Sequence, residues 1–239
     1  MRALVLSDIH GNIDALQAFD RQWAARLHEF DHVIVLGDLV DYGPAPHDVI
    51  EWVRAHATDV VRGNHDHAMA TRESCRSSAG YREAATVTRD LLRPTLTSAD
   101  LRYLGDLEVT RTIADGQERW RLAHATPRDP LFAYLRPADG RARWVDELAG
   151  WTGGGVLLGH THLAFCLRVG ATLVVNPGSL GMPKDGHPSG SYAIIDGDSV
   201  QFRRVEYDTA ATISRLRTIG LPDRVFAQLA GTFHTGLCE

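Results

Sequence analysis

The stretch ALVLSDIHGN, residues 3–12, decides the fold class because it joins a short apolar run to a polar turn. Its first five residues have the length and apolar character of a buried strand. From Asn12 onward apolar residues recur at helical spacing, and asparagine is a common helix N-cap. Asp8 and His10 therefore lie between a strand and a helix, where ligand sites of parallel βαβ units form.

Two further strand-to-loop junctions follow the same plan. Each begins with apolar residues at strand length and ends at a glycine followed by a polar residue. They are VIVLGD, residues 33–38, and DVVRGNH, residues 59–65, with a predicted helix at 47–56 between them. Strands that alternate with helices at this spacing predict a parallel sheet whose carboxyl ends collect the polar side chains.

Residues 66–107 differ in character from the segments on either side. They are polar and helix-forming, and we expect them to form a small helical cap inserted in a single domain of residues 1–239. The buried face of this cap is predicted to include the leucines Leu91, Leu92, Leu96, Leu101 and Leu104.

The second half of the chain is richer in strand patterns. A hairpin is expected around Asp115-Gly116, and further strands are expected before and after the histidine pair at 160 and 162. Two helices are expected near 209–219 and 222–229. Without repeats or linkers, this order predicts an α/β domain of two packed sheets with outer helices.

Five polar clusters follow apolar, strand-like runs along the chain. Glycines beside four of these clusters permit tight turns and close backbone approach. A D-x-H or H-x-H step at a strand end can place both side chains on one side, because strand side chains alternate with period two. The candidate metal-binding residues are Asp8, His10, Asp38, Asn64, His124, His160 and His162.

This combination of ligand types predicts divalent metal ions. Several unpaired histidines and aspartates at strand ends would be costly to bury without a cation that satisfies them. Carboxylate, imidazole and amide oxygen together suit manganese, iron, zinc or cobalt better than calcium or magnesium. Seven groups are too many for one ion, so we expect two, with manganese favoured and iron, zinc, cobalt or nickel as alternatives.

In type and order the clusters resemble the signature of the calcineurin-like metallophosphoesterases, and especially of the small prokaryotic phosphodiesterases in that superfamily. The matching blocks are D-x-H at 8–10, G-D-x-x-D at 37–41, G-N-H-D at 63–66, a separate histidine at 124 and G-H-x-H at 159–162. The resemblance implies a four-layer αββα sandwich of two mixed sheets flanked by helices.

The resemblance also implies roles for individual residues. Asp38 would bridge the two ions, and His65 would be the catalytic histidine, oriented by Asp41. One ion would be held by Asp8, His10 and His162, and the other by Asn64, His124 and His160.

The implied activity is hydrolysis of a small phosphodiester or nucleotide-like phosphate ester by a hydroxide that bridges the metals. Tyr42 stands where the protein phosphatases of the superfamily have an arginine, which weakens a phosphoprotein-phosphatase reading. A phosphomonoesterase, a dinucleoside-polyphosphate hydrolase and a non-catalytic scaffold with this fold remain alternatives. Tyr42 itself can serve either packing or hydrogen bonding, and the segment 176–179 either a phosphate nest or a turn.

Composition and the order of residues limit the classes of protein to which this chain can belong. A formal net charge of −5 argues against a protein that tracks nucleic-acid phosphates, and the apolar runs are far shorter than a membrane span. Asp8 and His10 come too early for a signal peptide, so we expect a cytoplasmic protein. The sequence does not indicate an oligomeric state.

Overall fold

The computed structural model describes residues 1–237 and contains two mixed β-sheets of five strands each. In the first sheet the three N-terminal strands run parallel, the next to last strand of the chain pairs antiparallel with the first, and the last pairs antiparallel with it in turn. Its order is β10-β9-β1-β2-β3, with β1 at Arg2–Leu6, β2 at His32–Val35, β3 at Asp59–Val60, β9 at Gly190–Asp196 and β10 at Ser199–Val205.

The second sheet begins with the expected hairpin, whose turn places Gly116 at a φ of +60°. Strands β5, β6 and β8 run parallel, whereas the two edge strands are antiparallel to their neighbours. The order is β4-β5-β6-β8-β7, with β4 at Thr110–Asp115, β5 at Glu118–Ala123, β6 at Gly155–Leu157, β7 at Ala164–Val169 and β8 at Thr172–Pro177.

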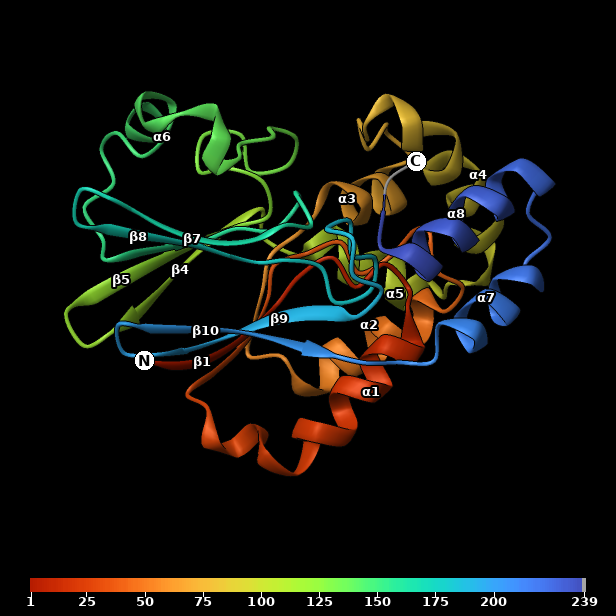
Figure 1. Ribbon diagram of the computed structural model, residues 1–239, viewed down its shortest axis with the longest axis horizontal. Helices are drawn as coiled ribbons and strands as arrows, with labels where there is room; N and C mark the ends of the chain where they lie inside the picture. Colours follow the sequence, from red (N-terminus) through yellow and green to blue (C-terminus); the bar gives the residue numbers. More distant parts are fainter. Residues whose placement is uncertain (238–239) are drawn as a thin grey trace.

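The sheets pack face to face and helices cover their outer faces, which confirms the predicted four-layer α/β sandwich (Figure 1). Strand β1 shows how the layers form, since Val5 faces the second sheet while Leu4 and Leu6 face the helices. The helices α1, Ile13–Trp23, and α2, Pro46–His56, cover the first sheet, and α6, Arg141–Glu147, covers the second. Asn12 caps α1 by accepting a hydrogen bond from the Ala15 N–H, as expected.

The remaining α-helices gather at the end of the molecule toward which β1 runs (Figure 1). They are α3, Asn64–Thr71, α4, Arg82–Leu92, α5, Ser98–Asp106, α7, Thr209–Arg217, and α8, Asp223–Thr235. Short 3-10 helices lie at Ala24–Glu29, Ala79–Tyr81, Arg93–Thr95 and Pro137–Asp139. Within residues 1–237, no helix combines the length and the apolar character that crossing a membrane requires.

The predicted cap stretch is helical, but its buried face differs from the expected one. Leu92, Leu96 and Leu104 are buried, whereas Leu91 is 38% exposed and the prediction for it was wrong. Adjacent residues of a helix point about 100° apart, and the buried face of α4 is centred near Leu92, so Leu91 falls outside it. The helix instead buries Ala85, Thr88 and Arg89 with Leu92.

Candidate metal centre

Six of the seven predicted ligands lie in loops that follow strands, the seventh starts the helix after β3, and the structure brings all seven together. Asp8 and His10 follow β1, Asp38 follows β2, Asn64 starts α3 after β3, His124 follows β5, and His160 and His162 lie between β6 and β7. All seven side chains are buried. The two sheets therefore contribute to one polar site at their shared carboxyl end.

One cluster is formed by Asp8, His10 and His162. The Asp8 Oδ1 atom lies 3.3 Å from His162 Nε2 and 3.9 Å from His10 Nε2, and the two imidazole nitrogens are 3.3 Å apart. Although Asp8 is fully buried, its Oδ1 atom has no hydrogen-bond partner among the residues described. A buried carboxylate oxygen that faces two imidazole nitrogens fits a bound cation.

A second cluster contains Asp38, His124 and His160, with Asn64 beside it. His124 Nε2 lies 3.1 Å from Asp38 Oδ2, 3.2 Å from His160 Nδ1 and 3.0 Å from Asn64 Oδ1. The same Asp38 Oδ2 atom is 3.7 Å from His10 Nε2 in the first cluster. One oxygen of Asp38 thus faces both clusters.

Backbone carbonyls select the imidazole nitrogens that face the clusters. The Nδ1 atoms of His10 and His124 bond to the carbonyl oxygens of Val40 and Leu36, at 2.8 and 2.7 Å. These bonds place the proton on Nδ1 and leave the lone pair on Nε2. Burial lowers the pKa of His10 well below its usual range, which keeps that ring neutral.

His124 differs from the other three candidate ligand histidines, because without a metal its Nε2 atom also holds a proton. Burial disfavours its charged form, but the attraction of Asp38 raises the pKa of His124 to about 9. A metal ion at this ring therefore displaces a proton, which makes metal affinity depend on pH.

The backbone of these loops is the reason that the side chains converge. Asp8, His10, Asp38, His160 and His162 all have φ between +49° and +66°, in the left-handed region that residues other than glycine rarely adopt. The alternation of strand side chains, on which our sequence argument relied, does not apply, because these residues lie beyond the strand ends. The predicted proximity is found, but its physical cause is the left-handed turn.

Buried hydrogen bonds hold the loops in this conformation. Asp66 accepts from the backbone N–H groups of Asp38, Leu39 and Gly63 at 2.8 to 3.0 Å. Gly63 is required at its position, because a Cβ atom there would lie 2.0 Å from an Asp38 carboxylate oxygen.

The segment 176–179 supports the loops as well. Asn176 donates to the Gly159 carbonyl at 2.6 Å, and the Ser179 hydroxyl donates to the Asp8 carbonyl at 2.7 Å. The Gly178 N–H is bonded to the Asn176 side chain, so the segment is a brace for the site loops and not an open nest for phosphate.

His65 and Asp41 form a pair beside the clusters. His65 Nδ1 lies 2.7 Å from Asp41 Oδ2, and the Tyr42 hydroxyl lies 3.4 Å from His65 Nε2. Burial opposes a charge on His65, but Asp38 and the bond to Asp41 raise its pKa well above the usual range. Tyr42 is 1% exposed, so its ring packs in the core while its hydroxyl reaches the site.

Other side chains near the site were not predicted from the sequence. The Tyr134 ring lies 3.9 Å from the His160 ring, and Lys184 Nζ lies 5.7 Å from the centre of the Tyr42 ring. Arg89 bonds to Asp41. The available signal for Arg89 was a charged residue at helical spacing from Ala85 and Leu92.

Comparison with known proteins identifies the family. The model of the calcineurin-like phosphoesterase superfamily domain matches residues 1–199. The chain belongs to this superfamily. It is 31% identical to a metallophosphoesterase from Sphaerobacter thermophilus, with a TM-score of 0.77 and 99% of each chain covered.

Two curated relatives extend the comparison. An uncharacterized protein of Methanocaldococcus jannaschii is 28% identical over 92% of this chain and 93% of its own. Phosphodiesterase YfcE of Escherichia coli is 27% identical over 83% of this chain and 89% of its own. Membership makes this calcineurin-like chain a phosphoric ester hydrolase, and the family implies divalent metal ions in a site such as the one described.

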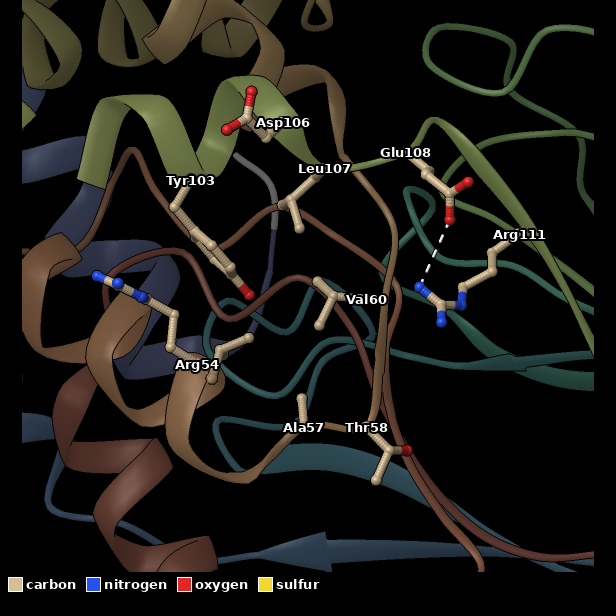
Figure 2. A pocket seen from close by; sticks show the side chains of 10 residues that line it. Arg54, Ala57, Thr58, Val60, Tyr103, Asp106, Leu107, Glu108 and Arg111 are labelled. Atoms are coloured by element: carbon tan, nitrogen blue, oxygen red, sulfur yellow. Dashed lines mark hydrogen bonds and ion pairs between the residues drawn. The ribbon is translucent and has the colours of Figure 1, made fainter. Parts of the chain in front are cut away.

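A separate cavity of about 350 Å³ lies beside α2 and α5, and none of the candidate ligands lines it (Figure 2). Arg111 in its wall pairs with Glu108 and Asp59, and Arg54 lies over the Tyr103 ring at 5.4 Å. Both arginines that line this cavity therefore already interact with other side chains of the protein. The metal centre is the better candidate for the phosphoesterase site.

The bonds to Asp66 generate a prediction about stability. Asp66→Ala leaves three buried N–H groups without an acceptor, and each costs about 1 to 3 kcal/mol. We expect the free energy of unfolding to fall by about 3 kcal/mol or more, measured by urea denaturation with a chelator present. Asp90→Ala, at an exposed position, is the control. Equal stability of the two variants would contradict the anchoring role.

Proposed function

We propose that the site binds two divalent ions and hydrolyses a phosphodiester or a nucleotide-like phosphate ester. The position of Asp38 carries this proposal, because its Oδ2 atom faces His124 in one cluster and His10 in the other. Its Oδ1 atom accepts from the backbone N–H of His65 at 2.9 Å, which fixes the carboxylate in the bridging orientation. Manganese is the proposed metal, with iron, zinc, cobalt or nickel as alternatives.

The ions and the residues around them would supply the nucleophile, stabilise charge and protonate the leaving oxygen. Two bound ions would supply a hydroxide at neutral pH and offset charge on the phosphoryl oxygens. Asp41 holds the His65 ring through Nδ1, so Nε2 points toward the site, where a proton is needed on the leaving oxygen. The Tyr42 hydroxyl near the same nitrogen completes this edge of the site.

Three observations support an ester with a single negative charge and a planar leaving group. Tyr42 offers only a phenolic group where an arginine would bind a dianion bidentately. Arg62 bonds to the carbonyls of Gly105 and Leu107 and is committed elsewhere. The Tyr134 ring, 38% exposed and packed on His160, presents a surface for stacking beside the metals.

Lys184 favours a second candidate, a phosphomonoesterase or dinucleoside-polyphosphate hydrolase. Its ammonium lies over the rings of Tyr42 and Tyr81, and its charge contributes, after burial, to the lowered pKa of His162. A point charge at this place would attract a substrate with additional negative charge. The ratio of kcat/KM for a phosphodiester to that for the matching monoester distinguishes the two candidates.

The bridging role of Asp38 predicts the effect of Asp38→Asn on metal content. An amide replaces the carboxylate shared by both clusters, so we expect occupancy of both sites to fall and most activity to disappear. Elemental analysis after gel filtration measures the metal, with Asp90→Asn as the surface control. Two tightly held ions in Asp38→Asn would show that Asp38 is not the bridge.

The pair of His65 and Asp41 predicts a variant that keeps its metals and loses its rate. His65→Asn should bind both ions nearly as well as the parent, yet turn over about a hundredfold more slowly, as expected for loss of a general acid. His67→Asn is the matched control, because that neighbouring histidine bonds to Glu73 outside the clusters. Loss of metal from His65→Asn would make His65 a ligand instead.

The substrate proposal predicts a preference between two esters. With manganese present, kcat/KM for an aryl phosphodiester should exceed that for the matching monoester, because Tyr42 stands where an arginine would receive the second charge of the monoester. Parallel steady-state kinetics on the two esters make the measurement. A monoester preference of about tenfold, worth roughly 1.4 kcal/mol, would favour the second candidate.

A further inference from the structure

Helix α4 of the cap stretch reaches the His65–Asp41 pair through one buried side chain. Arg89 donates to Asp41 Oδ2, the same oxygen that accepts the hydrogen bond from His65 Nδ1. The Arg89 side chain is 9% exposed and Asp41 is fully buried. A guanidinium, a carboxylate and an imidazole therefore form one continuous buried contact.

The same helix also holds the turn that carries Asp41. Asp41 and Tyr42 are consecutive residues with φ of +65° and +63°, and each such residue costs about 1 to 2 kcal/mol relative to its ordinary conformation. The Tyr42 N–H donates to the Thr88 hydroxyl at 3.1 Å. Thr88 and Arg89, adjacent on α4, thus bind the backbone and the side chain of this strained turn.

Electrostatics explain why a cation is needed behind Asp41. The Asp41 Oδ1 atom has no hydrogen-bond partner among residues 1–237, so its donors all meet at Oδ2. Without Arg89, the buried Asp41 carboxylate would be held by a single hydrogen bond, the one from His65, and would be free to rotate about it. The guanidinium of Arg89 compensates its charge and fixes the oxygen that orients His65.

We propose that Arg89 is a positioning residue for phosphate-ester hydrolysis, acting on His65 through Asp41 and making α4 part of the catalytic apparatus. The inference rests on the proposed acid role of His65. Among residues 1–237, Arg89 forms no hydrogen bond or ion pair with any of the seven candidate ligands, and its side-chain partners are Asp41 and the thiol of Cys75. Its loss should therefore change the rate of turnover while leaving metal binding and substrate binding intact.

Three variants test the role of Arg89 with the metal-loaded enzyme. Arg89→Ala should lower kcat about tenfold or more with little change in KM or metal content, since misplacing a catalytic group is costly. Millimolar guanidinium should restore part of the lost rate to Arg89→Ala, and Arg89→Lys should lie between it and the parent. Arg82→Ala, an exposed arginine on the same helix, is the matched control.

A double-mutant cycle with Asp41→Asn shows whether Arg89 acts through Asp41. If it does, Arg89→Ala causes little further loss of kcat in the Asp41→Asn background. Full additivity, a change in KM alone, or a loss of metal would overturn the proposal. Thermal melts check folding, and if Arg89→Ala does not fold, the same cycle is completed with Arg89→Lys.

Comparison of the turnover rate of His65→Asn with that of the parent enzyme distinguishes a failure of this inference from a failure of the proposed function. If His65→Asn retains the parent rate, the acid role fails and the inference fails with it. If His65→Asn is slow while Arg89→Ala and Arg89→Lys match Arg82→Ala, only the role of Arg89 is wrong.

Discussion

The structure depends on holding buried carboxylates and imidazoles within ligand distance of one another. Burying carboxylates and imidazoles this close together costs free energy, because the groups lose water and like charges repel. A cation that lies between them offsets this cost. The backbone adds a further cost, because a left-handed residue other than glycine loses about 1 kcal/mol or more. Residues of this kind in the site loops are Asp8, His10, Asp38, Asp41, Tyr42, His160 and His162. Metal ions that bind the folded chain and not the unfolded one would offset both costs.

The site also joins the two sheets at one end of the sandwich. Asp8, Asp38 and Asn64 follow strands of the first sheet, whereas His124 and His160 follow strands of the second. Direct bonds cross between them, such as the one from His124 Nδ1 to the Leu36 carbonyl. The apolar layer between the sheets fixes their separation over the rest of their length. Metal binding at these residues would therefore be coupled to packing of the sheets, since a shift of one sheet would move three or four of the seven candidate ligands relative to the others.

Local patterns predicted the elements and the proximity of the candidate ligands, because strands and helices follow hydrophobic periodicity and these side chains stand in short motifs. The left-handed turns were not predictable, since Asp and His tolerate this conformation only where surrounding bonds impose it. Arg89 lies 48 positions from Asp41 along the chain, and no motif connects the two. Its role depends on how α4 packs, which single-sequence reasoning does not determine. The exposure of Leu91 escaped prediction for the same reason.

The charges of the buried carboxylates bear on how many ions the site can use. The charge of Asp41 is balanced by Arg89, and the charge of Asp66, which accepts from three backbone N–H groups, is offset in the total by protonated His65. Asp8 and Asp38 remain, and a single dication would only neutralise them, leaving no positive charge for a phosphate. A second dication leaves a surplus of two charges, which one hydroxide and one phosphodiester monoanion would cancel. A monoester dianion would give the site one excess negative charge unless Lys184 balanced it. The ester preference and the role of Lys184 are therefore linked.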